Sequence, residues 1–184
     1  MAAANGIAPE LQSFLRFLRE NPHVRSRIPA PRNKTVVYCG EMLNAGQVHA
    51  AWRLLKQAKA QDPVRFDYVT VEERLQSLFV VEFGRTLYEE AGQLSDALNA
   101  KGLADQSMIL WRALSGIYVQ GAHGRVRALI LPGANIAKKV FSVTEVKVLL
   151  RPDVLANIDL DAELLRAFRL YVQGGLTPAP IVVF

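Results

Sequence analysis

Two segments of the sequence carry side chains whose types and spacing could act together on one ligand. Trp111 and Ser115 are four residues apart in a predicted helix, which places an indole ring and a hydroxyl on the same helix face. Further along, Glu145 stands near the head of the apolar run 143–150, which we interpret as a strand. A carboxylate at a strand start can face a cleft while its neighbours anchor it. An indole face and a fixed carboxylate both attract positive charge, so these residues are candidates for chemistry on a cationic group.

Several common catalytic signatures are missing from the sequence. It contains no Gly-x-x-x-x-Gly-Lys-Ser/Thr phosphate loop, no Gly-x-Gly-x-x-Gly and no Gly-x-Ser-x-Gly. The three histidines are far apart and lack the spacing of metal ligands, so we expect no metal. A nucleophilic pair of Cys39 and His49 is conceivable, but a cysteine in a β-branched run is more often a small buried side chain.

Composition indicates a folded domain with an anionic partner. The 184 residues are 51% hydrophobic and 21% charged, with a formal net charge of +5. No apolar run reaches the roughly 18 residues that a membrane span requires, and the first residues lack the pattern of a secretory signal, so we expect no membrane partner. The basic stretch from Arg25 to Lys34 has no interleaved aromatic residues, which argues against nucleic acid.

Hydrophobic periodicity predicts an α/β fold with an α+β-like arrangement. Helical spacing dominates the first two thirds of the chain, and strands alternate with helices afterwards. We therefore expect a mainly helical lobe, about 41–121, packed against a small parallel sheet with flanking helices, about 122–184; residues 1–33 form an N-terminal helix and a Pro-rich link. Helices are predicted over 9–18, 47–60 and about 72–100, the last with interruptions near Gly84 and Gly92. A further helix, capped by Asp105 or Ser107, ends at about 120, and short helices open at Pro152 and Asp161. The predicted strands are 34–40, 126–131, 143–150 and 180–184.

The order of motifs resembles the ADP-ribosyl cyclase and NAD glycohydrolase family, including its relatives among bacterial toxin domains. The resemblance covers roughly residues 34–160, and residues 34–184 would form the catalytic domain. It rests on a helical Trp-x-x-x-Ser, a small-residue turn, an apolar strand, Phe-x-x-x-Glu, Leu-x-x-Pro and an upstream strand that ends in an aromatic residue. In this sequence these are Trp111 with Ser115, Gly121 to Gly124, Val126 to Leu131, Phe141 with Glu145, Leu149 to Pro152, and Lys34 to Tyr38.

The resemblance implies cleavage of the bond between nicotinamide and ribose in NAD or NADP, which are substrates, with no cofactor and a minor cyclase activity. Glu145 matches the catalytic glutamate and Trp111 the tryptophan that stacks on nicotinamide. The family's second acid lies in a Thr-Leu-Glu element, which Thr70-Val71-Glu72 matches best, although Glu89 in Thr86-Leu87-Tyr88-Glu89 competes with Glu72. The matching substrate-binding residues are Ser115, Tyr38 and Phe141.

This chain departs from the family at two places. Cys39 and Gly40 follow the upstream aromatic residue where the family often has serine or arginine, and one cysteine excludes the disulfides of the secreted animal members. The second departure fits a bacterial effector that acts in the cytoplasm after secretion and has a cognate immunity protein as partner. The alternatives are an ADP-ribosyltransferase-like toxin and a non-enzymatic basic interaction domain.

Overall fold

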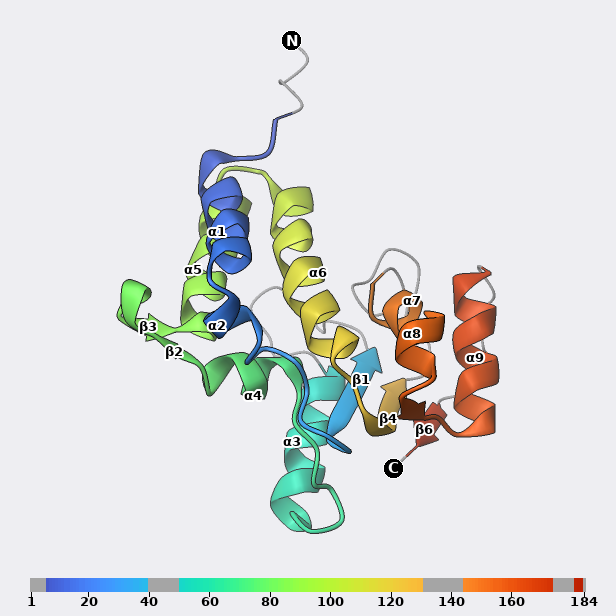
Figure 1. The fold of residues 1–184 in the computed structure, drawn as a ribbon. Coiled ribbons are helices and arrows are strands. Elements are labelled where there is room, and N and C mark those ends of the chain that lie inside the picture. The colour runs from blue at the N-terminus through green and yellow to red at the C-terminus, as the bar shows by residue number, and fades with distance from the viewer. Residues whose placement is uncertain (1–5, 40–49, 131–143, 174–180, 184) are drawn as a thin grey trace.

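A computed structural model describes residues 6–39, 50–130, 144–173 and 181–183 (Figure 1). Helices α1 (Pro9–Glu20), α5 (Leu87–Ala100) and α6 (Ala104–Gln120) stand side by side in one half of the molecule. Helices α7 (Val146–Leu149), α8 (Pro152–Leu155) and α9 (Ala162–Val172) form the other half. The main sheet lies between them, near the C-terminal end of α6. The predicted α/β fold is confirmed: a mainly helical part packs against a small sheet with flanking helices.

The sheet is parallel except at one edge. Strand β1 (Thr35–Cys39) pairs in parallel with β4 (Gly124–Ile130), in a register that sets Tyr38 beside Leu129. Strand β5 (Ile158–Asp159) is also parallel to β4, whereas β6 (Ile181–Val183) is antiparallel to it. Alternate residues of β1 point to opposite faces, so Val37 and Cys39 join the large core while Val36 packs beneath α3 (Ala50–Gln61).

The N-terminal helix is part of the main core. In α1, Leu11, Phe14 and Leu18 are buried at the spacing of one helix face, and α1 packs against α6. The short helix α2 (Pro22–Arg25) and the Pro-rich link after it add Val24 and Ile28 to the same core. Residues 8–30 therefore support the helix that carries Trp111 and Ser115.

The segment before α5 was predicted as helix from about residue 72 with an interruption near Gly84, and the helical prediction is wrong for residues 79–86. It contains helix α4 (Val71–Gln76) and then a hairpin of β2 (Phe79–Val80) and β3 (Arg85–Thr86), joined by the 3-10 turn η1 (Val81–Phe83). The predicted break at Gly84 is real, because its φ of 64° ends the turn in the left-handed region. The predicted break at Gly92 is wrong, since α5 runs through it.

The run 143–150 was predicted as a strand, but its described part is helical. Thr144 and Glu145 form a wide turn that leads directly into α7. Val146 and Leu149 are both fully buried, and their spacing of three is that of a helix face packed against α6 and α9. A short run of valines and leucines fits either element in sequence, and the packing of both faces decided for the helix.

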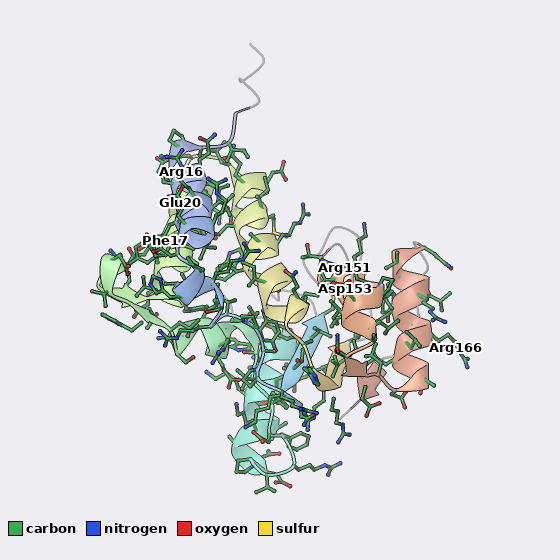
Figure 2. The ribbon with its side chains drawn as sticks, in the orientation of Figure 1. Arg16, Phe17, Glu20, Arg151, Asp153 and Arg166 are labelled. Carbon is green, nitrogen blue, oxygen red and sulfur yellow. The ribbon has the colours of Figure 1, made fainter. Side chains whose placement is uncertain are left out.

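Two further helix starts test the predicted caps. The predicted cap of α6 by Asp105 or Ser107 is wrong, because the N-cap is Leu103 and no side chain caps it. The predicted helix start at Asp161 is confirmed: Asp161 is the N-cap of α9, and its carboxylate accepts bonds from the backbone N–H groups of the first turn. At the start of α8, Arg151 and Asp153 form an exposed ion pair of 2.6 Å (Figure 2).

Residues 47–49 of the helix predicted at 47–60 lie outside the described residues.

Tyr118 joins three elements behind the sheet. Its fully buried hydroxyl donates a hydrogen bond to the carbonyl oxygen of Val69, just before α4, and accepts one of 3.2 Å from the backbone N–H of Val36 in β1. Since Tyr118 lies one helical turn from Ser115, this hydroxyl fixes the distance between α6, β1 and the start of α4.

We predict that Tyr118→Phe lowers the free energy of unfolding by about 1–3 kcal/mol, because it leaves two buried backbone groups without this partner. Urea unfolding monitored by circular dichroism measures the change. Tyr88→Phe is the matched control, since no hydrogen bond of its hydroxyl occurs among the described residues, and it should change stability by less than about 0.5 kcal/mol. Equal losses in the two variants would contradict the role given to Tyr118.

Candidate active site

Glu145 is buried against helix α6. Glu145 is only 6% exposed, and Ser115 is 3% exposed. The hydroxyl of Ser115 donates a hydrogen bond to Glu145 Oε1. Gly116 allows the two segments to come this close, because a Cβ at that position would lie 3.3 Å from the Thr144 methyl carbon. The helix that carries Ser115 thus holds the carboxyl group of Glu145 in one place.

A second carboxyl group faces Glu145 from helix α4. The Tyr38 hydroxyl, at the end of β1, donates a hydrogen bond to Glu72 Oε1. Glu72 Oε2 is buried and has no hydrogen-bond partner among the described residues. A buried carboxylate oxygen without a hydrogen-bond partner is costly for folding, which makes Glu72 a candidate for a role in binding or catalysis.

Both carboxyl groups have a raised affinity for a proton. Burial, and then the negative charge of Glu72, raise the pKa of Glu145 to about 8, although the hydrogen bond from Ser115 opposes the shift. Burial likewise raises the pKa of Glu72, against the hydrogen bond from Tyr38. The pKa of Tyr38 is raised by burial and by both acids, so its phenol stays protonated and remains a donor. At neutral pH the pair therefore holds at least one proton.

Trp111 is fixed on the same face of α6 as Ser115. Its indole N–H donates a hydrogen bond of 3.1 Å to Ser95 Oγ in α5, and Ser95 is bonded to the Ser107 hydroxyl at 2.7 Å. The Tyr88 ring lies 6.1 Å from the Trp111 ring, centroid to centroid, at a tilt of 53°. Burial and then the charge of Glu72 raise the pKa of Tyr88, so Tyr88 lies near the carboxyl group of Glu72 as well as beside the indole.

Capping boxes explain why Glu72 is in this cluster and Glu89 is not. In both Thr70-Val71-Glu72-Glu73 and Thr86-Leu87-Tyr88-Glu89, the threonine caps the helix and the glutamate three residues later bonds back to its backbone N–H. Glu89 is therefore tied to Thr86 at the exposed start of α5, and these bonds lower its pKa. The residues in the middle of each box, Glu72 and Tyr88, turn toward the cluster.

The structure thus brings together five of the six residues that the sequence singled out. Glu145, Ser115, Glu72 and Tyr38 are linked by hydrogen bonds and by the interaction of the two acids, and Trp111 joins them through its position on α6 and its contact with Tyr88. Phe141 lies outside the described residues. Tyr38, Glu72, Tyr88 and Trp111 are half-buried, so the cluster reaches the surface on their side.

Sequence reasoning missed two members of the arrangement. Tyr88 stands beside Glu89, the residue that competes as the match for the family's second acid, and Ser95 has no neighbour in sequence that suggests a ligand. The capping box could have indicated Tyr88. It predicts that the Glu89 side chain bonds to the backbone of Thr86, which leaves Tyr88 in the same turn able to face the cluster. No local signal pairs Ser95 with Trp111, because the two are on different helices.

No family model matches this chain, and no curated protein or solved structure matches it either. Within the described ranges no group of three or more His, Cys, Asp or Glu side chains could hold a metal ion. In the same ranges, none of the helices combines the length and the apolar character needed to cross a membrane. Cys39 is buried beside Tyr38 in β1 and forms no disulfide.

We predict that the proton on Glu145 makes stability fall with rising pH. The folded protein keeps this proton up to about pH 8, whereas the unfolded chain gives it up near 4.5, so each step in pH between these values favours unfolding. Urea unfolding at pH 5.5 and pH 8 should show a loss of about 2–4 kcal/mol in the wild type that Glu145→Gln removes. Glu89→Gln, in which the pKa shift has the opposite sign, should leave the loss in place. A parallel loss in wild type and Glu145→Gln would contradict the buried, protonated state.

We predict that Ser95→Ala releases the Trp111 ring, because the indole N–H loses its acceptor. In a Trp52→Phe background Trp111 is the only tryptophan, since the chain has two. Its fluorescence should shift to longer wavelength as water reaches the ring, and stability should fall by about 1 kcal/mol. Ser77→Ala, on an exposed residue at the end of α4, is the control and should leave the emission unchanged. An unchanged spectrum for Ser95→Ala would show that other contacts hold the ring.

Proposed function

We propose that the protein is an NAD(P) glycohydrolase that cleaves the bond between nicotinamide and ribose. The observation that carries the proposal is the buried carboxyl pair of Glu145 and Glu72, held by Ser115 and Tyr38, with Trp111 one helical turn before Ser115 on α6. The pair is expensive to bury, so a role in binding a cation accounts for it best.

Glu145 would act on the ribose. As nicotinamide leaves, positive charge develops on the sugar, and the transition state is a cation of the oxocarbenium type. A fixed carboxylate beside that cation stabilises it, and the low-dielectric surroundings strengthen the attraction. The leaving group departs as a neutral pyridine, so no general acid has to protonate it. The approach of the cationic nicotinamide ring also lowers the pKa of Glu145 and favours loss of its proton to solvent.

Trp111 would hold the nicotinamide ring. An indole face attracts a cationic aromatic ring by stacking and cation–π interaction, worth on the order of 1–2 kcal/mol. The hydrogen bond to Ser95 and the contact with Tyr88 hold the ring before substrate arrives, which reduces the entropy lost on binding. Tyr38 offers a second aromatic wall at the end of β1.

Glu72 would contribute at the nicotinamide side of the site. Its unpartnered Oε2 is an acceptor for a donor group such as the carboxamide N–H₂. By contributing negative charge beside Glu145 it also increases the attraction of the site for the cationic ring. A minor cyclase activity is compatible with the same site. We further propose that, as a toxin effector, the protein has a cognate immunity protein as partner.

We predict that purified protein releases nicotinamide from NAD, measured by chromatography at pH 7.5. Glu145→Gln should lower kcat/KM by about 100-fold or more, because it removes the charge and keeps the shape. Trp111→Ala should lower it by about tenfold, mainly through KM. Glu89→Gln is the matched control, because glutamine preserves the capping box, and it should retain wild-type activity.

Other outcomes would point to the alternatives. Transfer of labelled ADP-ribose to a protein or nucleic acid, with little free ADP-ribose, would identify an ADP-ribosyltransferase. No heat of NAD binding together with full tolerance of Trp111→Ala would indicate a binding domain. Equal nicotinamide release by wild type and Glu145→Gln would remove Glu145 from the reaction.

A further inference from the structure

Two arginine side chains carry positive charge that no acid in the described part of the chain pairs with. Arg74 of α4 is half-buried, and its Nε is buried without a hydrogen-bond partner among the described residues. Arg27, in the link that follows α2, is exposed. Over the described ranges neither guanidinium group forms a hydrogen bond or an ion pair. A guanidinium group has five N–H donors and no acceptor, so both side chains have donors free for an oxyanion.

Tyr118 holds together the two segments that carry these arginines. The backbone N–H of Ala30, in the link, donates a hydrogen bond of 3.1 Å to the carbonyl oxygen of Tyr118. The Tyr118 hydroxyl donates to the carbonyl oxygen of Val69, just before α4. In Figure 1 the chain that leaves α2 passes next to α4. Burial and then the positive charge of Arg27 lower the pKa of Arg74, so the two guanidinium groups lie close enough to interact.

The two acids that precede Arg74 in the sequence are directed elsewhere. Glu72 belongs to the acidic cluster, and residues two positions apart in a helix are rotated by about 200°, so Glu72 and Arg74 leave α4 on different sides. Glu73 completes the capping box of α4 and forms an ion pair of 3.0 Å with Lys59. Among the described residues no carboxyl group contributes to the lowered pKa of Arg74. Two like charges therefore lie near each other without a counter-charge, and an anion bound between them would relieve their repulsion.

We propose that Arg27 and Arg74 form a binding site for a doubly charged tetrahedral oxyanion, a phosphate or sulfate group. Two guanidinium groups match the charge of a dianion, and each can donate a pair of N–H groups to its oxygens. The bound group would draw the Arg74 guanidinium outward, so that its Nε–H gains an acceptor. A singly charged carboxylate would leave one positive charge uncompensated. The inference does not depend on the proposed glycohydrolase activity, because no residue of the acidic cluster takes part.

NMR titration of the full chain with sulfate, followed through the arginine Nε–H signals at constant ionic strength, tests the proposal. The Arg74 signal should shift to saturation, and sulfate should bind at least about tenfold more tightly than acetate, which carries a single charge. Arg27→Gln and Arg74→Gln should each weaken sulfate binding by about fivefold or more. Arg16→Gln is the matched control, since Arg16 is exposed on α1 and lies far from α4 (Figure 2), and it should bind sulfate as the wild type does.

Any of three results would overturn the proposal. These are no saturable shift of the Arg74 signal, equal affinity for sulfate and acetate, or an affinity for sulfate that is the same in Arg27→Gln and Arg16→Gln. Sulfate held by other basic side chains would give the third result. Thermal unfolding followed by circular dichroism establishes that each variant is folded. Because Arg27 is exposed, Arg27→Gln keeps the test decisive even if Arg74→Gln does not fold.

Discussion

Two carboxyl groups that share a buried site are the constraint on which the arrangement depends. Burying one charge in a protein is unfavourable, and burying a second of the same sign beside it is more so. Two hydrogen bonds reduce this cost, one from Ser115 to Glu145 and one from Tyr38 to Glu72. The pKa values of both acids are raised, so the pair keeps a proton that reduces its charge. Glu72 Oε2 is still left without a partner among the described residues. An arrangement that lowers stability and is so closely held is typical of a site for binding or catalysis.

The scaffold around the pair is rigid because long-range contacts fix each element that carries a site residue. Tyr118 ties α6 to β1 and to the residue before α4 through backbone groups. The bond from Trp111 to Ser95 ties α6 to α5. Capping boxes start α4 and α5, and they leave Glu72 and Tyr88 directed inward. These hydrogen bonds therefore hold the elements that carry the aromatic rings and the acids of the cluster in place.

The comparison of sequence and structure shows where local patterns are sufficient. The helical stripe of α1, the strand at Thr35 and the helix start at Asp161 follow from short-range patterns and are confirmed. The run that contains Glu145 was predicted wrongly as a strand, because valine and leucine fit both elements until their neighbours are known. The hairpin at Gly84 was missed for a related reason, since its strands of two residues are too short to show a period.

The sequence by itself determined which side chains share a helix face and in what order the chemistry-bearing residues occur. Those properties depend on a rise and rotation per residue that are the same in every helix. Only the tertiary structure decided that Glu72 rather than Glu89 approaches Glu145, that Tyr88 and Ser95 hold Trp111, and that the pKa of Glu145 is raised to about 8. Proximity and burial of this kind arise when segments far apart in the chain pack together, and no local spacing encodes them.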